Sequence, residues 1–145
     1  MIIGSWKIFA LLSAFFAALT AIFGKIGVTG IDSNFATFIR TVVILIFISL
    51  MLIFGDFKFS TFKDLTPHQI AFLVLSGLCT GFSWLCYYRA LQLGPASSVA
   101  PVDKLSVAFA ILLAWIFLGE KMTMNTAVGG ALIVVGSIII LLGTL

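Results

Sequence analysis

Residues 96–120 read ASSVAPVDKLSVAFAILLAWIFLGE, and this stretch decides how the chain is folded. Its apolar part, residues 105–118, reaches only about 21 Å as a helix, whereas the hydrocarbon core of a bilayer is about 30 Å thick. A helix that spans a membrane here must therefore extend back through Lys104, Asp103 and Pro101. The stretch predicts a membrane protein in which two opposite charges and a proline lie at or below the membrane boundary.

Two interpretations of this stretch are open. Ionisable residues at membrane depth are costly and usually line a pathway. Pro101 has no N–H for the carbonyl of Ser97, so the helix is expected to be irregular near it. In the alternative, the helix begins at Ser97 with Pro101 in its first turn, and both charged side chains reach the lipid headgroups.

The composition of the whole chain indicates an integral membrane protein. Of its 145 residues, 62% are hydrophobic and 9% are charged, whereas a soluble domain has about 25% charged residues. The net charge of +3 comes from few residues and no basic run. We attribute it to orientation signals beside membrane lipids and expect no nucleic-acid partner. The apolar N-terminus is expected to be a retained first span and not a signal peptide.

Five apolar segments are each near the 20 residues that a transmembrane helix needs. They predict an all-α membrane protein with a single domain over residues 1–145 and helices at about 6–28, 33–54, 68–91, 97–118 and 125–142. Most connections are short, so successive helices are expected to be antiparallel neighbours.

In the second segment, as in residues 96–120, a charged residue precedes an uncharged stretch that is too short to cross a bilayer. Residues 41–54 are uncharged and reach only about 21 Å as a helix, so Arg40 is drawn toward the hydrocarbon. Counting crossings, Arg40 enters from the same side as Asp103 and Lys104, at similar depth, which predicts a polar cavity on that side. Adjacent residues on a helix point about 100° apart. Asp103 is therefore expected to meet Arg40 or another cation and not necessarily Lys104.

The third segment adds polar and aromatic residues to this candidate pathway. Ser83 and Tyr87 belong to a polar stripe at helical spacing, and Trp84 lies close to them in sequence. Aromatic residues near the end of a span are typical of the membrane interface. The other interpretation is an aromatic wall for an organic substrate.

The fifth segment carries Gly129, Gly136 and Gly143 at intervals of seven residues. A smooth glycine face on a membrane helix is a packing surface. These glycines are therefore predicted to contact another helix, including one from a second copy.

No enzyme signature is present in the sequence. The chain has one histidine, His68, and lacks a phosphate-binding loop, a metal-spaced His/Cys cluster and a His/Asp partner set for its serines. We therefore expect no enzymatic activity, no metal and no other cofactor.

Four segments follow one another in an order that resembles a known family. They are AIFGKIGV (21–28), FIRTVVIL (38–45), GLCTGFSWLCYYRALQLGPASSVAPV (77–102) and FLGEKMTMNTAVGGALIVVGSIII (117–140). Together they resemble the EamA-type repeat of the drug/metabolite transporter superfamily over nearly the whole chain. The stretch 101–104 resembles the short five-helix bacterial and archaeal group. Larger members carry two such repeats of opposite orientation, whereas this chain has one.

The resemblance implies secondary transport of small organic molecules, often as efflux, in the inner membrane, with the site between two repeats. The last segment is also similar to that of the small multidrug resistance proteins. In those proteins glycine heptads form the dimer contact, and a glutamate embedded in the first helix couples protons. The first segment here has no acid, so simple proton exchange would need Asp103 in that role.

Three functions are therefore weighed. In the first, a transport pore forms between two copies, Arg40 and Lys104 attract an anionic or zwitterionic substrate, and Asp103 holds them in place or carries a proton. In the second, the chain is a subunit of a flippase for a lipid-linked head group. In the third, it is a structural or regulatory partner of another membrane protein and transports nothing.

The distribution of basic residues predicts an antiparallel homodimer. Five crossings place Lys7, Lys58, Lys63 and Lys121 on one side of the membrane, and Lys25 and Arg89 on the other, joined by Arg40 and Lys104 if they reach the headgroups. Orientation follows this bias. Because the bias here is weak, one sequence can insert both ways, and two inverted copies would recreate the repeats that many transporters use.

Overall fold

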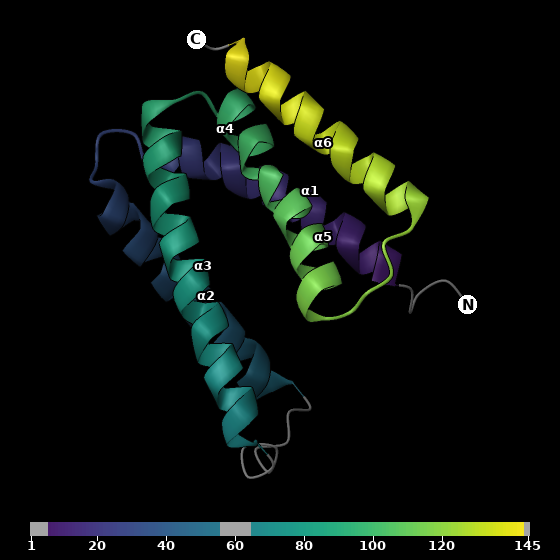
Figure 1. The fold of residues 1–145 in the computed structure, drawn as a ribbon. Coiled ribbons are helices and arrows are strands. Elements are labelled where there is room, and N and C mark those ends of the chain that lie inside the picture. The colour runs from purple at the N-terminus through teal and green to yellow at the C-terminus, as the bar shows by residue number, and fades with distance from the viewer. Residues whose placement is uncertain (1–5, 56–64, 144–145) are drawn as a thin grey trace. The chain divides into compact units, whose positions relative to one another are not determined.

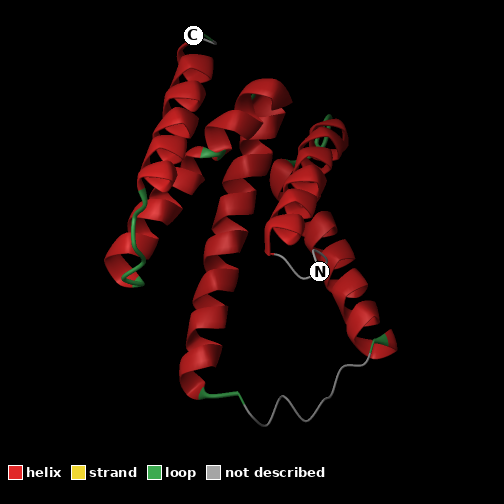
Figure 2. Ribbon diagram, turned by 90° about the vertical axis from the view of Figure 1, so that its right-hand side faces the viewer, coloured by secondary structure: helices red, strands yellow, loops and turns green. Residues whose placement is uncertain are grey.

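The computed structural model describes residues 6–55 and 65–143. Within these ranges the secondary structure is entirely helical, as Figure 2 shows. Lys58 and Lys63, which enter the charge comparison, lie outside the described residues. The chain divides into two compact units: a first unit of residues 6–26 with 93–143, and a second unit of residues 27–55 with 65–92.

The predicted all-α membrane fold is confirmed, with five helices in the described residues long and apolar enough to cross a bilayer. They comprise α1 (Trp6–Gly27), α2 (Ser33–Phe54), α3 (Pro67–Leu93), the pair α4 (Ala96–Asp103) and α5 (Leu105–Phe117), and α6 (Met124–Leu142). The fourth span, Ala96–Phe117, is therefore built from two helices in place of one. In Figure 1 the direction of the ribbon changes where α4 meets α5.

Local sequence signals explain where the helices begin. The Asp32 carboxylate accepts hydrogen bonds from the backbone N–H groups of Asn34 and Phe35, both at 2.9 Å, and so caps α2. The Thr123 hydroxyl caps α6 by accepting from the N–H of Thr126. Such side chains satisfy N–H groups that have no partner within the helix. Gly119 has a φ of +67°, which favours glycine, and it turns the chain after α5.

In the first unit, α6 packs along both halves of the broken span (Figure 1). Gly130 makes this approach possible, because a Cβ atom at that position would lie 3.0 Å from the Ile111 side chain on α5. The ammonium of Lys25, near the end of α1, donates a 2.8 Å hydrogen bond to the carbonyl of Gly94. Lys25 thereby satisfies a carbonyl just beyond the end of α3.

In the second unit, the buried residues lie in the connection at residues 28–32 and in the adjoining parts of α2 and α3: Val28, Ser33, Ala36, Thr37, Tyr88 and Leu91. The Gln92 side chain, at the end of α3, donates to the carbonyl of Ile31 at 2.8 Å. Most other large apolar side chains of α2 and α3 are exposed. That exposure is expected for helices whose outer faces meet lipid.

Candidate substrate pathway

The fourth span is interrupted at Lys104, three residues after Pro101. The N–H of Lys104 donates to the carbonyl of Pro101 at 3.0 Å, and that of Val107 to the carbonyl of Lys104 at 3.0 Å. Both bonds reach back three residues, as in a tight 3₁₀ turn. Because α4 begins at Ala96, Pro101 lies past the first turn, unlike in the alternative interpretation of the sequence.

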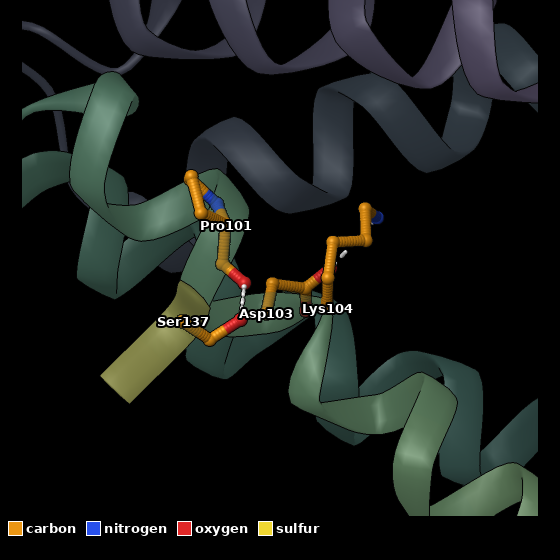
Figure 3. A network of polar contacts seen from close by, with 4 residues as sticks. All are labelled: Pro101, Asp103, Lys104 and Ser137. Atoms are coloured by element: carbon orange, nitrogen blue, oxygen red, sulfur yellow. Dashed lines mark hydrogen bonds and ion pairs between the residues drawn. The ribbon is translucent and has the colours of Figure 1, made fainter. Parts of the chain in front are cut away.

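Ser137 of α6 is tied to this interruption. Its hydroxyl donates a 2.8 Å hydrogen bond to the Pro101 carbonyl, as Figure 3 shows. Ser137 is buried, and Pro101 is partly exposed. The same carbonyl also accepts from the N–H of Lys104 in the tight turn, so a neighbouring helix supplies its second donor, as happens at irregular backbone in membranes. The contact therefore stabilises an irregular backbone inside the apolar span.

Asp103 and Lys104 form an ion pair with each other, with 3.2 Å between the ammonium and one carboxylate oxygen. The expectation that neighbouring residues point apart assumed a continuous helix. In the structure α4 ends at Asp103 and Lys104 lies in the turn, which brings the two side chains together (Figure 3). The side chains remain 34% and 52% exposed, respectively. The charged atoms thus stay open to a further partner.

Arg40 is held over two aromatic rings of α3. Its guanidinium carbon lies 4.0 Å from the ring centroid of Trp84 and 5.3 Å from that of Tyr88. Both distances are within the range of cation–π interactions, in which a cation is attracted to the negative face of a ring. Tyr88 is buried, whereas Arg40 and Trp84 are half-buried. Tyr88 belongs to the same group of aromatic residues near the end of the third segment as Trp84 and Tyr87, and its spacing of four residues from Trp84 places both on one face of a helix. Its contact with Arg40 was not predicted from the sequence.

Tyr87 and Ser83, the other two predicted pathway residues of α3, have surroundings that differ from those of Trp84. The Tyr87 ring meets that of Tyr88 edge-on, with centroids 6.4 Å apart and an angle of 62°. Ser83 is exposed, and within the described ranges its side chain has no polar contact. Arg40 and the α3 residues belong to the second unit, and the Asp103–Lys104 pair to the first. The common layer of these charges therefore stays a prediction.

The three predicted glycines of α6 differ in their surroundings. A Cβ atom at Gly129 or at Gly136 would meet nothing within 4 Å. Gly143 caps the C-terminus of α6, where a Cβ atom would lie 3.3 Å from the Ile139 carbonyl oxygen of the same helix. The glycine face that is open to a partner therefore consists of Gly129 and Gly136.

An open, mostly apolar pocket of about 320 Å³ lies at the hairpin between α5 and α6. Its lining includes Trp115, Glu120 and Thr126. No described residue pairs with the Glu120 side chain, whereas Asp103, in the same unit, pairs with Lys104. Glu120 is therefore a suitable acid to compare with Asp103. Among the described residues, no group of three or more His, Cys, Asp or Glu side chains could hold a metal ion.

Comparison with known proteins yields two similarities. The model of the EamA-like transporter family matches residues 4–142, a range that contains all five candidate spans. A protein of Sinorhizobium sp., named "uncharacterized transporter in cobO 3′ region", is 47% identical over 136 residues, which cover 94% of this chain and 96% of that protein. No solved structure matches the chain.

Proposed function

The chain belongs to the EamA-like transporter family and is a multi-pass membrane transporter, and from this premise we propose that it is a secondary transporter of small organic metabolites or drugs. It works by alternating access, as an antiparallel homodimer in the inner membrane. Its substrate pathway includes the charged residues at the break of the fourth span and the Arg40 site on α2 and α3.

The interrupted fourth span is the observation that supports transport most strongly. Lys104 lies about 12 Å along the helix from Ala96, well within a core about 30 Å thick. Lipid tails cannot solvate a half-exposed ion pair or an irregular backbone at that depth. Discontinuous helices of this kind surround the substrate sites of many secondary transporters. An aqueous pathway beside Asp103 and Lys104 accounts for the charges and the break together.

Asp103 is the acid that we assign to the transport cycle. The first span, α1, contains no acidic residue. Asp103 lies at the end of α4 with its side chain 34% exposed and Lys104 as its neighbour. It either holds the cations of the pathway in place or carries a proton.

The dimer follows from the single repeat and from the open face of α6. One chain supplies five candidate spans, whose surfaces are largely uncovered in the monomer. Gly129 and Gly136 present a smooth surface on α6 that its own chain leaves open, and such surfaces allow helix backbones to approach closely. An inverted second copy provides the opposite repeat that alternating access uses.

Flux through purified protein in liposomes tests this function. We expect saturable uptake of at least one compound from a set of amino acids, quaternary amines and sugar phosphates, with loss of that uptake in Asp103→Asn. Glu120→Gln is the matched control, since it makes the same chemical change in the same unit away from the break. Lipid scrambling without solute flux would identify a flippase subunit. Absence of both activities would identify a non-transporting partner.

A further inference from the structure

Arg40 is surrounded by aromatic rings but has no acceptor among the described residues. The guanidinium carbon lies over the Trp84 ring, 4.0 Å from its centroid, and 5.3 Å from the centroid of Tyr88. Among the residues that the structure describes, none accepts a hydrogen bond from Arg40 or forms an ion pair with it. A guanidinium carries five N–H donors in its plane, and the two rings beside Arg40 do not take the place of a hydrogen-bond acceptor for all of them.

Arg89, in the same unit, has a different environment. Its guanidinium donates to the side chain of Gln92, which itself donates to the carbonyl of Ile31. Arg89 is exposed near the end of α3. It is therefore an arginine with a hydrogen-bond acceptor within its own chain, close to the end of a span.

The depth of Arg40 makes its unmet donors significant. It lies about 10 Å along α2 from Ser33, and an unpaired charge with free donors is costly inside a membrane. The contact with the Trp84 ring offsets part of that cost and holds the guanidinium beside α3. The planar fork of a guanidinium matches a planar group with two acceptor oxygens.

We propose that the edge of the Arg40 guanidinium binds the carboxylate of an organic substrate that carries one negative charge. This inference rests on the proposed transport function and names its substrate class. The carboxylate accepts two parallel hydrogen bonds from the guanidinium. The apolar body of the substrate lies against the aromatic residues of α3 around Trp84, because aromatic surfaces with few polar groups suit such a body.

Charge matching favours a carboxylate over other head groups. One guanidinium neutralises one negative charge, whereas a phosphate monoester carries about −1.5 to −2 at pH 7 and would keep an unpaired charge at low dielectric. An organic cation would be repelled by Arg40. Three compounds with the same phenyl ring separate these head groups: phenylacetate, phenyl phosphate and benzyltrimethylammonium.

Trp84 fluorescence reports binding directly. In a Trp6→Phe/Trp115→Phe background Trp84 is the remaining tryptophan, and its emission responds to changes at the neighbouring guanidinium. In phosphatidylcholine nanodiscs we expect a saturable shift with phenylacetate and a weaker or absent shift with the other two compounds. Arg40→Gln weakens phenylacetate binding about tenfold or more, Arg40→Lys weakens it less, and Arg89→Gln leaves it unchanged.

Several results would overturn the assignment. They are a shift with benzyltrimethylammonium in place of phenylacetate, unchanged phenylacetate binding in Arg40→Gln, and equal loss of binding in Arg89→Gln. Competition by phosphatidylglycerol would instead make the guanidinium a lipid phosphate site. The ranking of the three compounds on the parent protein decides the matter even if Arg40→Gln does not fold. Phenylacetate binding without flux of any tested solute would contradict the transport function but support the carboxylate site. Flux of benzyltrimethylammonium alone would support the transport function but contradict the carboxylate site.

Discussion

The hydroxyl of Ser137 donates to the carbonyl of Pro101 at 2.8 Å and connects α6 to the interruption of the fourth span. Hydrogen bonds between membrane helices contribute about 0.6 kcal/mol on average and up to about 1.7 kcal/mol. We expect Ser137→Ala to lower the free energy of unfolding by an amount in that range, measured by denaturation in mixed detergent micelles. The control is Ser106→Ala, since Ser106 is exposed on α5. Equal effects of the two substitutions would show that the contact does not stabilise the break.

Pro101→Ala separates stability from function at the same place. Alanine restores the missing N–H and removes a residue that costs about 3 kcal/mol inside a helix. We expect the variant to be more stable than the parent and less active in liposome flux, because a continuous helix removes the irregular backbone beside Asp103. Full activity in a stabilised variant would contradict the role given to the break.

The Asp103–Lys104 pair predicts non-additive effects. Removing one partner leaves the other charge without its neighbour, which costs about 3–5 kcal/mol at fully buried sites and less at this half-exposed one. Asp103→Asn and Lys104→Gln should each lower the free energy of unfolding, and the double variant should lose less than the sum of the two. Strictly additive losses would indicate that the 3.2 Å contact contributes nothing.

The contact of Arg40 with Trp84 predicts a second coupled pair. Trp84→Leu removes the ring face that meets the guanidinium at 4.0 Å, an interaction worth about 0.5–2 kcal/mol. The loss should be smaller in an Arg40→Gln background, because the cation is then already absent. A double-mutant cycle on unfolding measures this, and a coupling energy of zero would exclude the interaction.

Neighbouring glycines of α6 distinguish packing within the chain from packing between chains. Gly130→Ala places a Cβ atom 3.0 Å from Ile111 and should cost about 1 kcal/mol of stability. Gly136→Leu extends into space that its own chain leaves open, so it should spare stability and abolish the dimer. Single-molecule photobleaching measures the number of subunits in each complex. A Gly136→Leu protein that remains dimeric would show that the dimer contact does not involve this face of α6.

The sequence predicted the fold class well because it depends on apolar length, which each segment carries by itself. It also identified the charged residues of the fourth span, because residues 105–118 are too short to cross a bilayer alone. It could not predict the partner of Ser137, since that contact joins residues 36 positions apart. The pairing of Asp103 with Lys104 was missed because the position of the break depends on the tertiary contact at Pro101 and not on residues 103 and 104 alone. The contact of Tyr88 with Arg40 was not predicted, because the aromatic residues near the end of the third segment also fit an interfacial belt.

Flux by copies of fixed orientation tests the central claim, transport by an inverted pair, most directly. Met122→Lys/Met124→Lys adds charge at the N-terminal end of α6, and Leu93→Lys/Ser97→Lys adds charge where α3 ends and α4 begins, on the other side; all four residues are exposed. Two added lysines should outweigh the weak native bias and fix each variant in one orientation. We predict little flux from either variant alone and restored flux when the two are co-expressed. Full flux from each variant alone would contradict the inverted homodimer.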